Sequence, residues 1–209
     1  MQRNRGQKSL KEMRMDEQEL ILRVQNGDEM AFSEIVHAYK DKITNFLWQL
    51  TGDYQKAAEL AQETFLRVYF KANKYKPIAP LSSWIYTIAS NLAKTEMKKE
   101  RRMPTVSFDD VQNSLSDKND LANNPRNSEL KKNLKKALNN LHPRYRVPVI
   151  LKDIEGFSQD EIAEILKRPV GTIKARISRG RNHLKKELEK DSFTLSFFVK
   201  NEECKNGSV

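Results

Sequence analysis

The sequence predicts an all-α protein in which a flexible linker joins two small helical domains, the second with a helix-turn-helix. Three observations lead to this prediction. The 209 residues are 38% hydrophobic and 32% charged, with only seven Gly and seven Pro, which suits short amphipathic helices better than a sheet. Apolar residues recur at steps of three and four along most of the chain, as in a helix. Residues 104–127 are instead rich in Asn, Asp and Ser and have little apolar area to bury.

These features divide the chain into five parts. Residues 1–15 are basic and show little apolar pattern, so we expect a disordered arm. We expect the first helical domain over 16–103, the flexible linker over 104–127 and the second helical domain over 128–190. Residues 191–209 form a C-terminal tail, for which disorder is the default expectation.

The first domain is expected to begin with two helices of unequal length. The first, short helix carries Leu20, Ile21 and Val24 and stops at Asn26-Gly27. Asp28 can cap a long second helix, which Gly52 ends. The apolar residues of that second helix share one face: Phe32, Ile35, Val36, Tyr39, Ile43, Phe46, Leu47 and Leu50.

Two more helices complete the predicted first domain. Asp53 is placed to cap the third, which buries Ala57, Leu60, Ala61, Phe65, Val68 and Ala72. Pro77 and Pro80 enforce a loop, after which Ser82 or Ser83 opens a fourth helix that ends in the basic run 98–102.

The second domain carries the sharpest local signal in the chain. The domain begins with a stripe of leucines on one helix face, made of Leu130, Leu134, Leu138 and Leu141. A further helix then runs from Pro143 to Gly156. Ser158 and Glu161 form a capping box for a two-turn helix. A tight turn over 167–169 and a long basic helix to Lys190 follow, which is the helix-turn-helix arrangement.

The last helix is expected to lie in a DNA groove. Its apolar residues share one face, and small residues and cations occupy the opposite face and its flanks. Eight bases and two acids lie between Arg168 and Lys190, a balance that suits phosphate and base contacts. A solvated basic helix is the alternative, which the capped helix and tight turn before it disfavour.

Net charge and composition limit the classes of function that the protein can have. The net charge of +10 suggests a polyanionic partner. The single cysteine, Cys204, excludes an internal disulfide framework and a multi-cysteine metal site. No apolar run approaches the ~18 residues of a bilayer span, and no secretory signal is present, so we expect a cytoplasmic protein. No catalytic, cofactor or metal motif appears.

Two surfaces of the first domain allow alternative interpretations. Leu66 and Phe70 point outward from the third helix beside acidic residues, which indicates either a protein-binding face or packing beneath another helix. Six of the aromatic residues cluster between Phe65 and Tyr86, interleaved with lysines. That cluster suits unstacked bases, although Trp84 and Tyr86 could also be ordinary core residues.

Three segments resemble the extracytoplasmic-function (ECF) sigma factors, the smallest group of bacterial RNA polymerase sigma subunits. ELAQETFLRVY (59–69) is similar to the polymerase-clamp helix of that family, and SSWIYTIASNLAK (82–94) is similar to its promoter-melting helix. Residues 146–184 closely resemble its second domain, and the string GTIKARISRGR (171–181) is highly specific in this context.

The resemblance implies a role for each surface. The first domain would dock on the clamp of the β′ subunit of core RNA polymerase through Glu59, Gln62, Glu63 and Leu66. The loop and the fourth helix would capture a flipped base of the −10 element and stabilise the melted strand through Tyr75, Lys76, Trp84, Thr87, Asn91 and Lys94. The second domain would contact the −35 major groove through Thr172, Lys174, Arg176, Ser178 and Arg179. The β flap of the polymerase is implied as a further contact of the protein.

The resemblance also implies which partners the protein has. Promoter DNA and core polymerase would be bound, and a membrane-bound anti-sigma factor commonly holds relatives inactive. No enzyme activity, cofactor or small-molecule substrate is implied. Two other classes remain as alternatives: a stand-alone helix-turn-helix regulator, which needs its own dimer interface or effector pocket, and a nucleic-acid-processing enzyme, which needs acids or metal ligands. Core polymerase binding with specific initiation separates the three.

The length of the linker limits what the isolated protein can reach. Its 24 residues span about 27 Å as a flexible coil and about 80 Å at full extension. The implied promoter elements lie two duplex turns apart, about 70 Å. We therefore predict that the isolated protein never contacts both elements at once, and that polymerase holds the linker extended.

Overall fold

A computed structural model describes residues 17–102 and 125–190, and within those ranges every regular element is helical. The all-α prediction is therefore confirmed. The predicted arm, nearly all of the predicted linker and the C-terminal tail lie outside the described residues.

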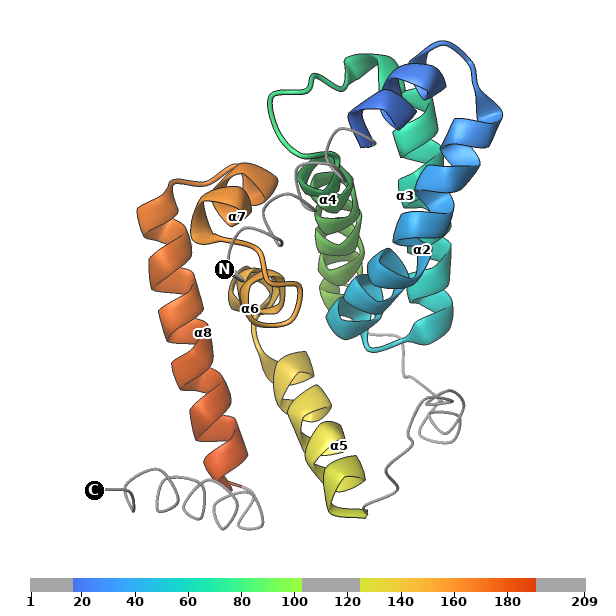
Figure 1. The fold of residues 1–209 in the computed structure, drawn as a ribbon. Coiled ribbons are helices and arrows are strands. Elements are labelled where there is room, and N and C mark those ends of the chain that lie inside the picture. The colour runs from blue at the N-terminus through green and yellow to red at the C-terminus, as the bar shows by residue number, and fades with distance from the viewer. Residues whose placement is uncertain (1–16, 103–124, 191–209) are drawn as a thin grey trace, which may run out of the picture.

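Each domain contains four α-helices in the described ranges (Figure 1). The first domain holds a helix over residues 17–25, α2 (Glu29–Thr51), α3 (Tyr54–Phe70), the short 3-10 helix η1 (Ala72–Lys74) and α4 (Leu81–Arg102). The second domain holds α5 (Pro125–Asn140), α6 (Pro143–Asp153), α7 (Gln159–Leu166) and α8 (Val170–Lys190). Helix α5 begins three residues before the predicted start of the second domain at residue 128.

The predicted helix ends of the first domain depend on local hydrogen bonds. The Asp28 carboxylate accepts from the backbone N–H of Met30 at 2.9 Å and caps α2. Gly52 follows α2 with a φ of 79°, a left-handed conformation that favours glycine. The Asp53 carboxylate accepts from the backbone N–H of Lys56 at 3.1 Å and caps α3. These three predicted caps are confirmed.

Two predicted helix ends are shifted. Helix α4 begins at Leu81 rather than at Ser82 or Ser83, because the Trp84 N–H already donates to the Pro80 carbonyl at 3.3 Å. Helix α6 ends at Asp153 rather than at Gly156. Gly156 instead lies in the following loop with a φ of 80°.

The helix-turn-helix forms as predicted, with a capping box before α7 and a turn before α8. Ser158 and Glu161 form both bonds of the capping box of α7. Lys167 ends α7 in the left-handed conformation with a φ of 51°, and α8 starts after Pro169. The buried residues of α8 are Ile173, Ile177 and Gly180, so this helix packs on α6 and α7 along one side.

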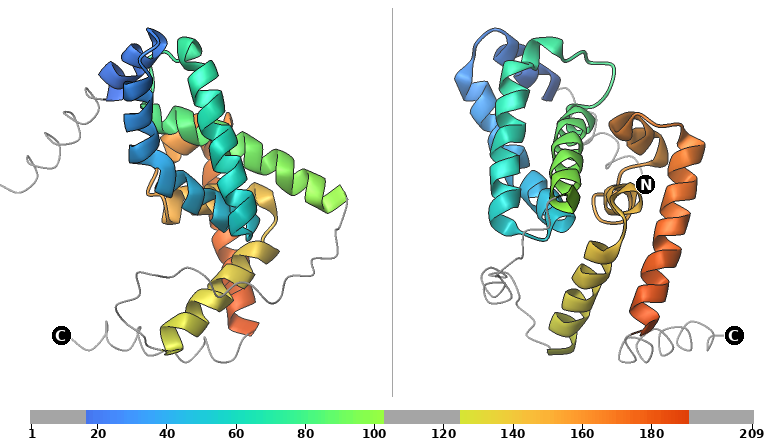
Figure 2. Two further views of the ribbon diagram at one scale, coloured as in Figure 1. Left: turned by 90° about the vertical axis from the view of Figure 1, so that its right-hand side faces the viewer. Right: turned by 180° about the vertical axis from the view of Figure 1, so that it is seen from behind.

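The two domains pack against each other, an arrangement that the sequence left open. Helix α4 lies between the α2–α3 pair and the second domain, as the views of Figures 1 and 2 agree. Its neighbours across the domain boundary are α7 and α6, while α2 also contacts α5 and α6. The long hydrophobic core therefore continues from one domain into the other.

Candidate interface for polymerase and promoter DNA

The outward face of α3 combines acids with exposed apolar side chains. Glu59 and Gln62 are exposed, and Leu66 and Phe70 are 52% and 77% exposed. Glu63 is half-buried and pairs with Arg67, with 2.7 Å between Oε1 and Nε. Leu66 and Phe70 thus do not pack beneath another helix, and we call Glu59, Gln62, Glu63, Leu66 and Phe70 the clamp face.

Partly buried contacts of Tyr75 and Gln25 hold the loop between η1 and α4 in one conformation. Tyr75 is only 6% exposed, its hydroxyl donates to the Ala79 carbonyl at 2.7 Å, and its ring packs against that of Trp84 with centroids 5.3 Å apart. The Gln25 amide donates to the Ala72 carbonyl at 2.9 Å. Tyr75 therefore shapes the loop, whereas Lys76 is exposed to solvent.

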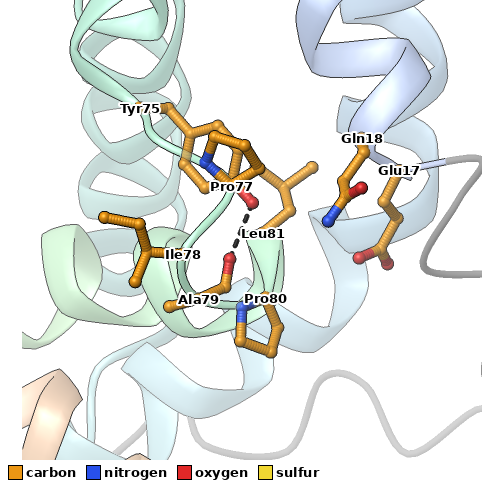
Figure 3. A pocket seen from close by; sticks show the side chains of 8 residues that line it. All are labelled: Glu17, Gln18, Tyr75, Pro77, Ile78, Ala79, Pro80 and Leu81. Atoms are coloured by element: carbon orange, nitrogen blue, oxygen red, sulfur yellow. Dashed lines mark hydrogen bonds between the residues drawn. The ribbon is translucent and has the colours of Figure 1, made fainter.

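A small cavity of about 130 Å³ opens between this loop and the helix over residues 17–25. Its lining residues are Glu17, Gln18, Tyr75, Pro77, Ile78, Ala79, Pro80 and Leu81. Figure 3 shows the two polar side chains, Glu17 and Gln18, on the side opposite the prolines and Leu81. No sequence pattern indicated this cavity, because its two walls lie more than fifty residues apart in the chain.

The other predicted −10 contacts share one face of α4. Trp84, Thr87 and Lys94 are half-buried and Asn91 is exposed. The Thr87 hydroxyl donates to the Ser83 carbonyl at 2.7 Å. Their spacing of three and four residues places them on one side of the helix.

Lys94 lies close to cations of the second domain. Burial, followed by the positive charges of Arg168 and Arg176, lowers the pKa of Lys94. Arg176 is itself a predicted −35 contact, so a predicted −10 residue and a predicted −35 residue lie within electrostatic reach of each other.

The predicted −35 residues form one surface of α8. Lys174, Ser178 and Arg179 are exposed, while Thr172 and Arg176 are half-buried. Arg181 points elsewhere and pairs with Asp153 of α6, with 3.0 Å between Nε and Oδ2. The surface is thus basic and largely open to solvent.

A contact between α4 and the loop before α7 joins the domains. The Tyr86 hydroxyl donates to Glu155 Oε2 at 2.5 Å, and the Tyr86 ring meets that of Phe157 edge-on at 4.8 Å. Burial raises the pKa of Glu155, and the Tyr86 hydroxyl and then Lys42 oppose that shift. Tyr86 is 3% exposed, so it is a core residue of the interface between the domains.

Arg146 makes a second contact between the domains. Its Nη1 donates to the Leu50 carbonyl at 2.6 Å, at the end of α2. Its guanidinium also donates to the carbonyls of Asn139 and Leu141. Helix carboxyl ends carry unpaired carbonyls and partial negative charge, which favours this buried cation.

The described residues contain neither a membrane-spanning helix nor a metal-binding cluster. No helix within 17–102 or 125–190 is long and apolar enough to cross a bilayer. Over the same part of the chain, no cluster of three or more His, Cys, Asp or Glu side chains could hold a metal ion.

The two domains match two known domain families. Residues 35–103 match Sigma-70 region 2, and residues 131–184 match Sigma-70, region 4. The all-helical fold and the two matched regions therefore define a sigma factor of the sigma-70 class.

The relatives narrow this class to one family. The ECF RNA polymerase sigma factor SigW of Bacillus subtilis is 33% identical over 180 residues, which cover 80% of this chain and 94% of that protein. The RNA polymerase sigma-H factor of Pseudomonas aeruginosa is 29% identical over 181 residues, 83% of this chain and 94% of that protein. This chain belongs to the ECF RNA polymerase sigma factors, as its motifs predicted.

Solved structures share the arrangement. CnrH in complex with the cytosolic domain of CnrY has a TM-score of 0.64 at 20% identity, covering 84% of this chain and 99% of that one, which shows the common fold. The sigma factor RpoE of Bartonella quintana, in complex with the anti-sigma factor NepR, has a TM-score of 0.58 at 27% identity. That match covers 77% of this chain and 98% of the other.

Proposed function

We propose that this ECF sigma factor binds core RNA polymerase and directs initiation at promoters through their −10 and −35 elements. The observation that carries the proposal is that a single chain holds both a region 2 and a region 4. A stand-alone regulator would account for the second domain only. The protein acts by binding, without enzyme activity of its own, and it acts in the cytoplasm.

The clamp face of α3 is the proposed dock for the β′ clamp. Its exposed Leu66 and Phe70 are flanked by acids on a protein of net charge +10. Apolar side chains of this size, exposed together, are typical of a protein interface, and the acids repel DNA phosphates. The proposed contact residues are Glu59, Gln62, Glu63 and Leu66.

The −10 element is the proposed ligand of the loop and of α4. Lys76 and Asn91 are exposed for direct contact, with Trp84, Thr87 and Lys94 beside them. Tyr75 is buried, so we assign it the role of holding the loop in the shape that receives an unstacked base. Removing a base from the stack is costly in a duplex and cheap in a melted strand, so this surface favours the open promoter.

The −35 element is the proposed ligand of α8. Exposed cations and small side chains allow the helix to enter a major groove, with Thr172, Lys174, Arg176, Ser178 and Arg179 facing the DNA. We further place the β flap of the polymerase on this second domain.

An inhibitory protein partner is also part of the proposal. The sigma factor RpoE, 27% identical to this chain, was solved with an anti-sigma factor. We expect a comparable partner here, anchored in the membrane, that keeps the protein from polymerase until a signal releases it.

Reconstitution with core polymerase tests this function. The purified chain is expected to support specific initiation, and the double variant Gln62→Ala, Leu66→Ala is expected to weaken core binding by at least tenfold, because centrally placed apolar anchors dominate such interfaces. Its thermal stability should remain near wild type. Both side chains are exposed, so their loss leaves no core cavity.

A matched pair of substitutions serves as the control. Leu22 is 53% exposed and Asn45 of α2 is exposed, and neither residue lies on α3. The variant Leu22→Ala, Asn45→Ala should bind core polymerase as the wild type does. If the clamp-face variant also binds normally, the dock lies elsewhere, and if the wild type does not initiate, the proposed function is wrong.

A further inference from the structure

The hydrophobic core of the second domain stops short of the ends of α5 and α8. Leu138 of α5 belongs to that core, and Leu184 of α8 packs against it. One turn before Leu138, Leu134 is 39% exposed, and one turn after Leu184, Leu188 is half-buried. Neither of these two side chains belongs to the core that the described residues form. We call Leu134, Leu184 and Leu188 the leucine seam.

The exposed part of the leucine seam lies at one end of the second domain. Helices α5 and α8 contact each other and run in opposite directions, so the start of α5 and the end of α8 lie at the same end of the molecule (Figures 1 and 2). The pKa of Glu187 on α8 is lowered by Lys190, and more weakly by Lys136 of α5. The two helices are therefore within electrostatic reach of each other at this end.

The C-terminal tail begins at the same place. Helix α8 ends at Lys190, and only Asp191 and Ser192 precede the sequence FTLSFFV (193–199), in which five of seven residues are apolar and none is charged. Two residues span at most about 7 Å, so this segment starts beside the leucine seam. Removing apolar side chains from water stabilises a protein, and the seam offers apolar area that the described residues leave uncovered.

A tethered segment has an advantage over a separate molecule at this surface. A short flexible connection gives an effective concentration on the order of millimolar, whereas a second copy of the chain competes only at its own, lower concentration. Lys136, Lys185 and Lys186 are exposed on α5 and α8, and Glu202 and Glu203 follow the apolar segment. Opposite charges therefore come together when the segment folds back, which favours the tail as the occupant of the seam.

We propose that residues 193–199 fold back onto the leucine seam and complete the core of the second domain. The segment covers Leu134 and Leu188 and holds the start of α5 and the end of α8 together. The match to Sigma-70, region 4 ends at residue 184, so neither Leu188 nor the tail belongs to the matched region. The interaction does not depend on the proposed function.

Amide hydrogen exchange of the full chain tests the proposal. Amides of residues 193–199 are expected to exchange at least about tenfold more slowly than in an unstructured peptide of the same sequence, because exchange then requires local opening. The double variant Leu134→Gln, Leu188→Gln should remove this protection, since it replaces the apolar surface of the seam. Its helices should remain folded, because neither leucine belongs to the core and glutamine is a good helix former.

Variants of the tail test the other side of the contact. Phe197→Gln, Phe198→Gln leaves every described residue unchanged and should remove the protection to the same extent. The seam and tail changes combined should lower the thermal unfolding temperature no further than either pair alone, because they break the same contact. The matched control is Leu22→Gln, Met30→Gln, whose side chains are 53% and 71% exposed on the first domain, and it should keep the protection of the wild type.

Four results would overturn this inference. The first is exchange of residues 193–199 in the free chain at the rate of an unstructured peptide. The second is protection that persists in the tail variant, which decides the question alone if the seam variant fails to fold. The third is protection that rises with protein concentration together with a dimer in light scattering, which would assign the seam to a second copy. The fourth is protection that appears only with core polymerase, which would assign the seam to polymerase.

None of these readouts requires transcription. Failure of the wild type to initiate with core polymerase would therefore contradict the proposed function alone, whereas loss of the exchange protection would contradict only the docking of the tail.

Discussion

Arg179 is the exposed cation of α8 that lies opposite the buried Ile173 and Ile177. We predict that Arg179→Ala weakens promoter binding by about 1–3 kcal/mol, the value of a base-edge contact. Binding to core polymerase should stay unchanged, because the clamp face is on the other domain and Arg179 is assigned to the DNA-facing side of the second domain and not to its contact with the β flap. Binding of holoenzyme to fork DNA with intact and altered −35 elements measures both effects.

Arg181 offers a control two residues away. It is exposed on the same helix, but its guanidinium pairs with Asp153 of α6. An exposed ion pair contributes only about 0–1 kcal/mol to folding stability, so Arg181→Ala should leave the fold intact. Because the Arg181 guanidinium is bound to Asp153, promoter affinity should stay near that of the wild type. Equal losses from both variants would mean that the charge of α8 matters and that Arg179 has no specific contact.

At the scale of a single element, the position of α8 depends on Gly180. A Cβ at this position would meet Val149 Cγ2 at 2.6 Å and Tyr145 Cβ at 3.3 Å. Val149 is 3% exposed and β-branched, so it has little freedom to move. Helix α8 can lie this close to α6 only because residue 180 has no side chain.

We therefore predict that Gly180→Ala destabilises the protein. Overpacking costs about 1–3 kcal/mol, whereas an alanine within a helix is worth at most about 1 kcal/mol more than a glycine. The net effect should be a lower thermal unfolding temperature. Gly171→Ala in the same helix is the control, since nothing lies within 4 Å of its Cβ, and it should be neutral or stabilising. Equal stability of the two variants would contradict the close packing.

At the scale of the whole molecule, the closed arrangement of the domains conflicts with promoter geometry. Helix α4 packs against α7, and burial followed by the charges of Arg168 and Arg176 lowers the pKa of Lys94, so the surfaces for the two elements lie on neighbouring parts of the molecule. The elements themselves lie about 70 Å apart on the duplex. The contacts of Tyr86 with Glu155 and of Arg146 with Leu50 must therefore separate before both elements are bound.

We predict that core polymerase opens the molecule. Fluorescent labels at Lys98→Cys on α4 and Glu164→Cys on α7, in a Cys204→Ser background, are both on exposed residues. Energy transfer between them should be high in the free protein and should fall when core polymerase is added. Labels at Asn45→Cys and Lys98→Cys lie within one domain and should show no change.

Persistent high transfer in a complex that initiates would contradict this prediction. The predicted linker permits the opening, since it reaches about 80 Å when extended. A linker only half that long could not span the elements.

The sequence by itself determined the helices, their caps and the family. Asp28, Asp53 and the Ser158–Glu161 capping box act on backbone groups within three residues, so their patterns can be read along the chain. The side of α8 that carries Arg179 also follows from the sequence. The clamp-face roles come instead from the family resemblance, and the exposure of Leu66 and Phe70 was decided by the structure.

Only the tertiary structure decided which surfaces meet. The bond between Tyr86 and Glu155 joins residues 69 positions apart, and that between Arg146 and Leu50 joins residues 96 positions apart. Helical periodicity identifies an apolar face but contains no information about the element that covers it. The closed domains, the requirement for glycine at residue 180 and the cavity beside Gln18 all depend on such distant pairs, whose packing is decided by the shapes of both partners together.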